Sequence, residues 1–109
     1  MDLTEHGVIL VTVDTQETAV AIAQSLVGDR LAACINLFPL HSVYTWNEQV
    51  QQAGEWQLVI KTDLGLFAAI EQALQMLHPY DVPEIIALPI VQGSTPYLAW
   101  LAASTAPLP

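Results

Sequence analysis

Two neighbouring stretches in the middle of the chain, 41–46 and 55–62, alternate between polar residues and apolar or aromatic ones. A period of two residues predicts strands, because successive side chains of a strand point to opposite faces. The polar segment 47–54 between them predicts the connection of a hairpin. Two strands joined in this way are antiparallel, which favours folds built on an antiparallel sheet.

The segments before and after the hairpin predict further strands and helices. The β-branched run 8–13 predicts a buried strand, and Asp14 with Glu17 resembles the capping box that opens a helix. That helix should end at 28–29, since glycine is favoured just past a helix C-terminus. A short last helix should begin near Pro96, because proline suits the first helical turn.

The remaining elements follow from the same rules. The apolar segment 31–36 predicts a second strand, which should break or bend at Pro39 before the chain enters the hairpin. Asp63 can cap a second helix, and 84–91 predicts a fourth strand, in which Pro89 favours an edge position or a bulge. The apolar stripe of the second helix consists of Phe67, Ile70, Leu74 and Leu77.

The resulting order is β-α-β-β-α-β, followed by a C-terminal helix. This order predicts an α+β, ferredoxin-like sandwich: one antiparallel sheet with helices on one face. A length of 109 residues fits one domain, 1–109, and we expect its tail, 105–109, to be frayed.

The composition indicates an oligomer. Hydrophobic residues make up 53% of the chain and charged residues 12%, against about 45–50% and about 25% in typical domains. A small monomer has too few charges here to cover its surface, so part of the apolar surface should be buried between subunits. The two middle strands also exceed what the core needs, and the free edges of a projecting hairpin can pair with another subunit.

The charge balance excludes two classes of partner. The formal net charge is −9, and Arg30 and Lys61 are the only Lys or Arg residues. Nucleic-acid phosphates and anionic membrane surfaces would both be repelled. Cys34 is the only cysteine, which rules out an intrachain disulfide and fits a reducing, cytoplasmic environment.

Several blocks of the chain, in the same order and spacing, resemble the signature blocks of the CutA divalent-ion tolerance family. They cover nearly the whole chain: 31–36, 42–46, Glu55 with 61–62, 78–80, 83–85 and 97–100. The resemblance implies a ferredoxin-like protomer and a tight homotrimer, assembled through the long strands into an architecture like that of PII-type signalling trimers. It also implies a role in tolerance to divalent cations, copper above all.

One position departs from the family pattern. Members often carry a Gly-Lys pair just after the Tyr-x-Trp motif, where this chain has Glu48-Gln49. The change removes a turn glycine and a cation, so the tip of the hairpin should differ in shape.

Four side chains are candidate ligands for copper or another divalent cation. Cys34 is a soft ligand that suits Cu(I), but a free cysteine inside an apolar strand more often acts as a small hydrophobe. His78 and Glu84 lie at the two ends of a stiff connector that contains two prolines, and His41 is a third plausible donor for Cu(II) or Zn(II). The alternative for His78 is that it ends the second helix and bonds a carbonyl of the last turn.

A second group of residues predicts a cleft between subunits, with apolar walls and a few convergent polar groups. Lys61 and Glu55 share one face of their strand by parity, and Lys61 should have a carboxylate partner in so acidic a chain. The cleft would bind a small molecule, in particular an organic anion, as in a PII-like sensor; the alternative is an aromatic, charge-paired trimer interface. The candidate residues are Tyr44, Trp46, Glu55, Lys61, His78, Tyr80 and Glu84.

The sequence gives no indication of catalysis. His41 and Ser42 are adjacent, but neighbours on a strand point to opposite faces and cannot form a nucleophile-base pair. The chain has no nucleophile-elbow motif, no phosphate-binding glycine loop and no HExxH, and no organic cofactor is indicated. We therefore expect a protein that is not an enzyme.

Overall fold

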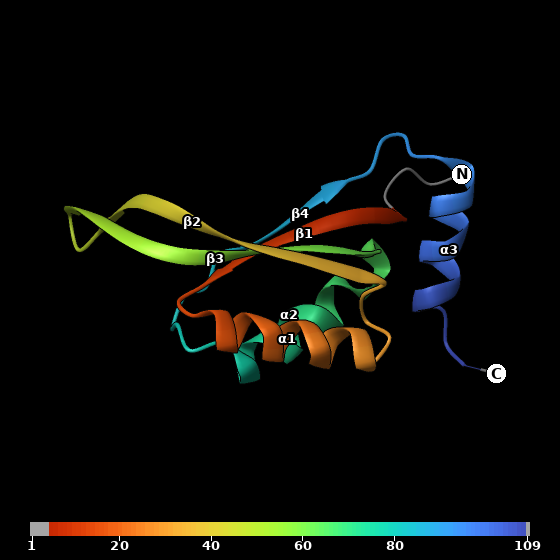
Figure 1. Ribbon diagram of the computed structural model, residues 1–109, viewed down its shortest axis with the longest axis horizontal. Coiled ribbons are helices and arrows are strands. Elements are labelled where there is room, and N and C mark those ends of the chain that lie inside the picture. The colour runs from red at the N-terminus through yellow and green to blue at the C-terminus, as the bar shows by residue number, and fades with distance from the viewer. Residues whose placement is uncertain (1–4, 109) are drawn as a thin grey trace.

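The computed structural model describes residues 5–108 and places two helices against one face of a four-stranded antiparallel sheet, with a third helix at the end of that sheet (Figure 1). The strand order is β2-β3-β1-β4, so the two outer strands are not consecutive in sequence. The predicted ferredoxin-like α+β fold is confirmed. The elements are β1 (His6–Val13), α1 (Gln16–Gly28), β2 (Cys34–Trp46), β3 (Gln49–Asp63), a 3₁₀ turn (Leu64–Leu66), α2 (Phe67–Leu77), β4 (Ile85–Pro89) and α3 (Thr95–Thr105).

The core lies between the sheet and the pair α1 and α2. Alternate residues of β1 and β3 point to the helices, as the period of two residues requires. Leu77 does not share the apolar stripe of α2, since it is 40% exposed. The largest core side chains are Ile9, Val11, Val13, Ile22, Leu26, Leu58, Ile60, Ile70 and Leu74.

Two helix starts differ from the prediction. The cap of α1 is Thr15, not Asp14: its hydroxyl accepts a hydrogen bond from the Thr18 amide at 3.1 Å. Asp63 accepts from the Gly65 amide at 2.8 Å, but it caps the 3₁₀ turn that precedes α2. Both caps satisfy first-turn amides that have no partner within their helices.

The hairpin of β2 and β3 is longer and tighter than predicted. β2 runs unbroken through Pro39, which is tolerated because β2 is an edge strand. The connection is Asn47-Glu48 alone, with φ of 50° and 62°, so both residues occupy the left-handed region that a type I′ turn requires. Pairing begins again at Gln49 opposite Trp46, and the hairpin projects well beyond the helices (Figure 1).

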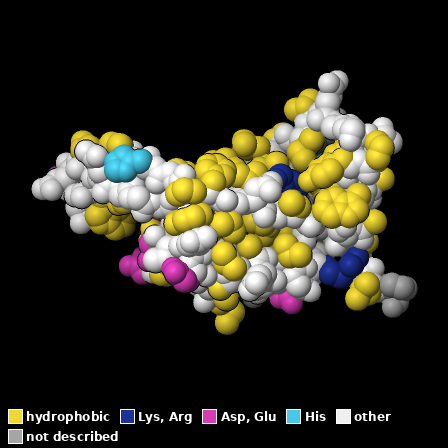
Figure 2. Space-filling model, in the orientation of Figure 1, with side chains coloured by type: hydrophobic (Ala, Val, Ile, Leu, Met, Phe, Trp, Pro, Cys, Tyr) yellow, Lys and Arg dark blue, Asp and Glu magenta, His cyan; other side chains and the backbone are white. Residues whose placement is uncertain are grey.

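The sheet face opposite α1 and α2, called here the outer face, is left largely uncovered. Register places Phe38, Ile86 and Leu88 on this face, and they are 46%, 48% and 48% exposed. Both edges of the sheet, β2 and β4, are also unpaired among residues 5–108. Figure 2 shows how widely hydrophobic side chains are spread over one side of the molecule.

The C-terminal helix is anchored to the loop after α1. Arg30 donates hydrogen bonds to the carbonyls of Ala106 and Ala103 at 2.9 and 2.8 Å. Thr105, the first residue of the tail predicted to fray, is the last residue of α3 and is buried, while Pro109 lies outside the described residues. None of the described helices has the length and apolar character needed to cross a membrane.

Candidate functional site

The connector after α2 is fixed to the sheet by His78. Its amide closes the helix by donating to the carbonyl of Leu74 at 2.8 Å, and Pro79 prevents a further turn. Its ring Nδ1 accepts from the Tyr80 amide at 3.1 Å, and Nε2 lies 2.7 Å from the carbonyl oxygen of Thr12 in β1. Because Nδ1 accepts, the proton is on Nε2, which donates to Thr12. The ring thus bonds a strand carbonyl, not one in the last turn of α2.

Tyr80 extends from this connector to β3. Its hydroxyl donates to Oε2 of Glu55 at 2.8 Å, and its ring packs against that of His78 with centroids 4.7 Å apart. Burial, followed by the hydrogen bond and negative charge of Glu55, raises the pKa of Tyr80 well above its usual value. The Tyr80 hydroxyl therefore remains the donor of this hydrogen bond, and the carboxylate of Glu55, which is only 9% exposed, remains its acceptor.

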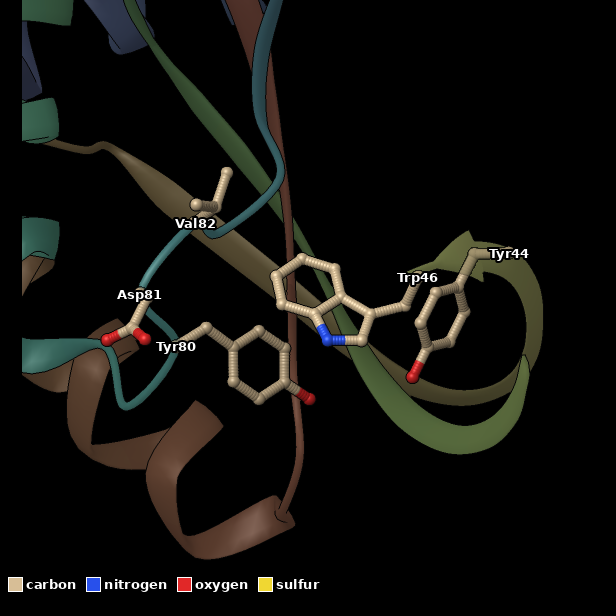
Figure 3. Close-up of a pocket in the computed structure, with 5 residues that line it drawn as sticks. All are labelled: Tyr44, Trp46, Tyr80, Asp81 and Val82. Atoms are coloured by element: carbon tan, nitrogen blue, oxygen red, sulfur yellow. The ribbon is translucent and has the colours of Figure 1, made fainter. Parts of the chain in front are cut away.

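Two adjoining hollows lie beside this pair, between the hairpin and the connector. One, of about 230 Å³, is lined by Tyr44, Trp46, Tyr80, Asp81 and Val82. Its three aromatic side chains point toward one another, and the Asp81 carboxylate turns away from them (Figure 3). The other, of about 290 Å³, is lined by Thr12, Ser42, Val43, Tyr44, Glu55, Tyr80 and Glu84. The hollows share Tyr44 and Tyr80, and together they are called the aromatic cleft.

The structure brings together most of the residues predicted for the cleft, with one exception. Tyr44, Trp46, Tyr80, Glu55 and Glu84 line it, and His78 supports it from behind. Lys61 does not lie there within one protomer. It is six positions from Glu55 along β3, roughly 20 Å away at the rise of an extended strand, and it pairs in register with positions 8 and 34.

The cleft is therefore anionic as well as aromatic. Two carboxylates line its second hollow, and neither Lys61 nor Arg30 lies beside it among the described residues. Sequence reasoning missed Thr12, which contributes a backbone carbonyl to His78, and Ser42, which was considered only as a nucleophile. A backbone contact of this kind has no signal in the side-chain pattern.

The four predicted metal ligands lie apart. Cys34 is half-buried at the start of β2, while His41 lies in the projecting part of the hairpin, 3.0 Å from Oε1 of Gln52. Both nitrogens of His78 are already hydrogen-bonded, so none is left for a metal, and Glu84 lines the cleft. No three His, Cys, Asp or Glu side chains in 5–108 are grouped so that they could hold a metal ion.

Fold and site define an α+β protein of the ferredoxin-like class, with a projecting hairpin over an anionic aromatic cleft. The family model described as CutA1 divalent ion tolerance protein matches residues 7–104. The chain belongs to this CutA1 divalent ion tolerance family.

Individual relatives agree with this assignment. The chain is 46% identical over 99 residues to the divalent-cation tolerance protein CutA of Thermus thermophilus, covering 90% of this chain and 96% of that protein. It is also 46% identical over 99 residues to a chloroplastic CutA protein of Arabidopsis thaliana, covering 90% of this chain and 54% of that longer protein. The solved structure of the periplasmic divalent cation tolerance protein CutA from Archaeoglobus fulgidus superimposes with a TM-score of 0.91 at 33% identity, covering 93% of this chain and 99% of that one.

Proposed function

We propose that this protein is a cytoplasmic homotrimer that binds divalent cations, copper in particular, and contributes to metal tolerance without catalysing a reaction. Membership of a family named for divalent ion tolerance supports the link to metals. The observation that carries the oligomeric part is the pair of unpaired sheet edges, β2 and β4, beside an uncovered apolar face.

The two free edges favour a ring. Because β2 and β4 are different strands, a contact between them uses a different surface on each subunit and is heterologous. Such contacts close into a ring when the rotation between subunits allows it, and a three-membered ring is the PII-like arrangement that the resemblance implies. Static light scattering tests this directly: a monodisperse monomer at micromolar concentration would contradict the proposal.

The donors available for copper are Cys34, His41 and Glu84. A half-buried thiolate suits Cu(I), and imidazole with carboxylate suits Cu(II). Because one protomer does not gather three such groups, we propose that donors from neighbouring subunits complete the site.

Calorimetry with Cu(II), and with Cu(I) under reducing conditions, tests metal binding. We expect a dissociation constant below about 10 μM that weakens in Cys34→Ala or His41→Ala. His6→Ala is the matched control, since it removes an imidazole at the start of β1 that is not a proposed donor. Binding weaker than this limit, or loss of binding in the control alone, would contradict the proposal.

Two parts of the proposal concern what the protein does not do. His41 and Ser42 are consecutive residues of β2, so their side chains leave the strand on opposite faces and form no nucleophile-base pair. An organic-anion sensor is not favoured, because the cleft is lined by carboxylates.

Cell fractionation with an antibody against the protein would test the proposed cytoplasmic location.

A further inference from the structure

Glu55 is a buried acid that has no cationic partner in the described part of the chain, 5–108. It is 9% exposed, and its one hydrogen bond among residues 5–108 comes from the neutral hydroxyl of Tyr80. An ionised carboxylate that is removed from water is costly unless a cation pairs with it. The guanidinium of Arg30 is used at the end of α3, so Lys61 is the only other Lys or Arg in the chain that could serve.

Lys61 has the complementary problem. It is partly buried on β3, and the part of the chain that the structure describes gives it no carboxylate partner. Parity along β3 places Lys61 and Glu55 on the same outer face of the sheet, but about 20 Å apart. A lysine side chain cannot span that distance, so the two charges cannot pair within one protomer.

The outer face is also the surface that a second copy would cover. Its apolar side chains on the two edge strands, Phe38, Ile86 and Leu88, are about half exposed. The unpaired edges β2 and β4 border this face, and the hairpin projects beyond the helices, so a second copy that pairs with one edge can also reach over the outer face with its hairpin. In a heterologous contact, the Glu55 end of one face can meet the Lys61 end of the next.

From this complementarity we infer that Lys61 of one protomer pairs with Glu55 of a second copy, so that each aromatic cleft is completed by its neighbour. The inference rests on the proposed trimer and names the charge pair that joins its subunits. In a closed ring every subunit gives one Lys61 and receives one, which leaves no such charge unpaired. The ammonium group would also enter beside the rings of Tyr44 and Tyr80, which attract a cation.

Charge reversal tests the pairing. Glu55→Lys and Lys61→Glu each place like charges together at every contact, and we expect each to raise the protein concentration at half-dissociation of the trimer at least tenfold. The double variant restores opposite charges, so we expect it to lie within about threefold of the wild type. Residues more than about 10 Å apart normally have additive effects, so such a rescue would show contact between subunits.

The test includes a matched control at Glu84 and a second pair of substitutions that remove the charges without reversing them. Glu84→Lys with Lys61→Glu should give no rescue, although Glu84 lines the same cleft. If a reversed variant fails to fold, Glu55→Gln and Lys61→Met provide a second cycle, in which the double variant should lose less than the sum of the singles.

The outcomes separate this inference from the proposed function. A stable trimer with additive effects, or rescue by the Glu84 pair, overturns the Lys61–Glu55 contact and leaves the trimer standing. A monomeric wild-type protein overturns the proposed trimer, and the inference falls with it.

Discussion

The turn at the tip of the hairpin gives the sharpest stability prediction. Glu48 has a φ of 62°, where a side chain costs about 1–2 kcal/mol but glycine is unstrained. Glu48→Gly removes this strain while leaving Asn47 in place, and Asn-Gly is a favoured type I′ pair. Glycine also makes the unfolded chain more flexible, which offsets about 0.4–1 kcal/mol. We therefore expect a net gain of about 0.5–1 kcal/mol per protomer.

Thermal and urea unfolding measure this effect. For a domain of this size the gain corresponds to a rise in Tm of about 2–6 °C. Glu48→Ala is the matched control: it removes the same charge but keeps a Cβ at the strained position, so it should give no comparable gain. Equal stabilisation by glycine and alanine would show that the charge matters and not the backbone, and a loss of stability in Glu48→Gly would refute the turn assignment.

Three further substitutions follow from single contacts. Gly7→Ala should lower the free energy of unfolding by about 1–3 kcal/mol in urea titrations, because the added methyl group overlaps the Leu64 side chain. Arg30→Gln removes two hydrogen bonds to the end of α3, so we expect a loss of about 1 kcal/mol and faster hydrogen exchange of the α3 amides. Tyr80 has a pKa raised in the folded state, so its stabilising contribution is complete below the unfolded pKa near 10 and is lost as the pH rises above it. Urea titrations from pH 9 to 11 should therefore show a steeper loss in the wild type than in Tyr80→Phe; parallel curves would refute the coupling.

The order of elements could be predicted from the sequence because it depends on local periodicity. The β-branched run of β1 and the apolar stripe of α1 both face the core and keep a clear pattern. The first residues of β3 could not be recognised in this way. At Gln49–Gly54 the hairpin projects past the helices, so neither face is packed against the core and no alternation is needed. Pro39 was also misleading. A proline cannot donate a hydrogen bond to a neighbouring strand, which predicted a break, but on an edge strand its nitrogen can face the side that has no neighbour.

Most of the predicted residues of the cleft do lie together, but its geometry could not be predicted. Aromatic residues with a few polar groups predicted Tyr44 and Tyr80 in it, and parity put Glu55 and Lys61 on one face. The contacts that shape the cleft join residues far apart in sequence: Tyr80 and Glu55 are 25 positions apart, and His78 and Thr12 are 66. Such pairings depend on strand order and on the path of the connector, which side-chain spacing alone does not give.

The hydrogen bonds of His78 also bear on where the proposed copper site can lie. A metal at this ring would have to displace either the Thr12 carbonyl or the Tyr80 amide, and leaving a buried polar group unpaired costs about 1–3 kcal/mol. That cost alone weakens binding by roughly 5- to 150-fold, whereas exposed His41 has no comparable penalty. His78→Ala should therefore lower the free energy of unfolding and leave copper affinity unchanged. His41→Ala should lower copper affinity and leave the free energy of unfolding unchanged. Calorimetry and urea unfolding on the same two variants distinguish these roles, and a loss of copper affinity in His78→Ala with no loss of stability would refute the argument.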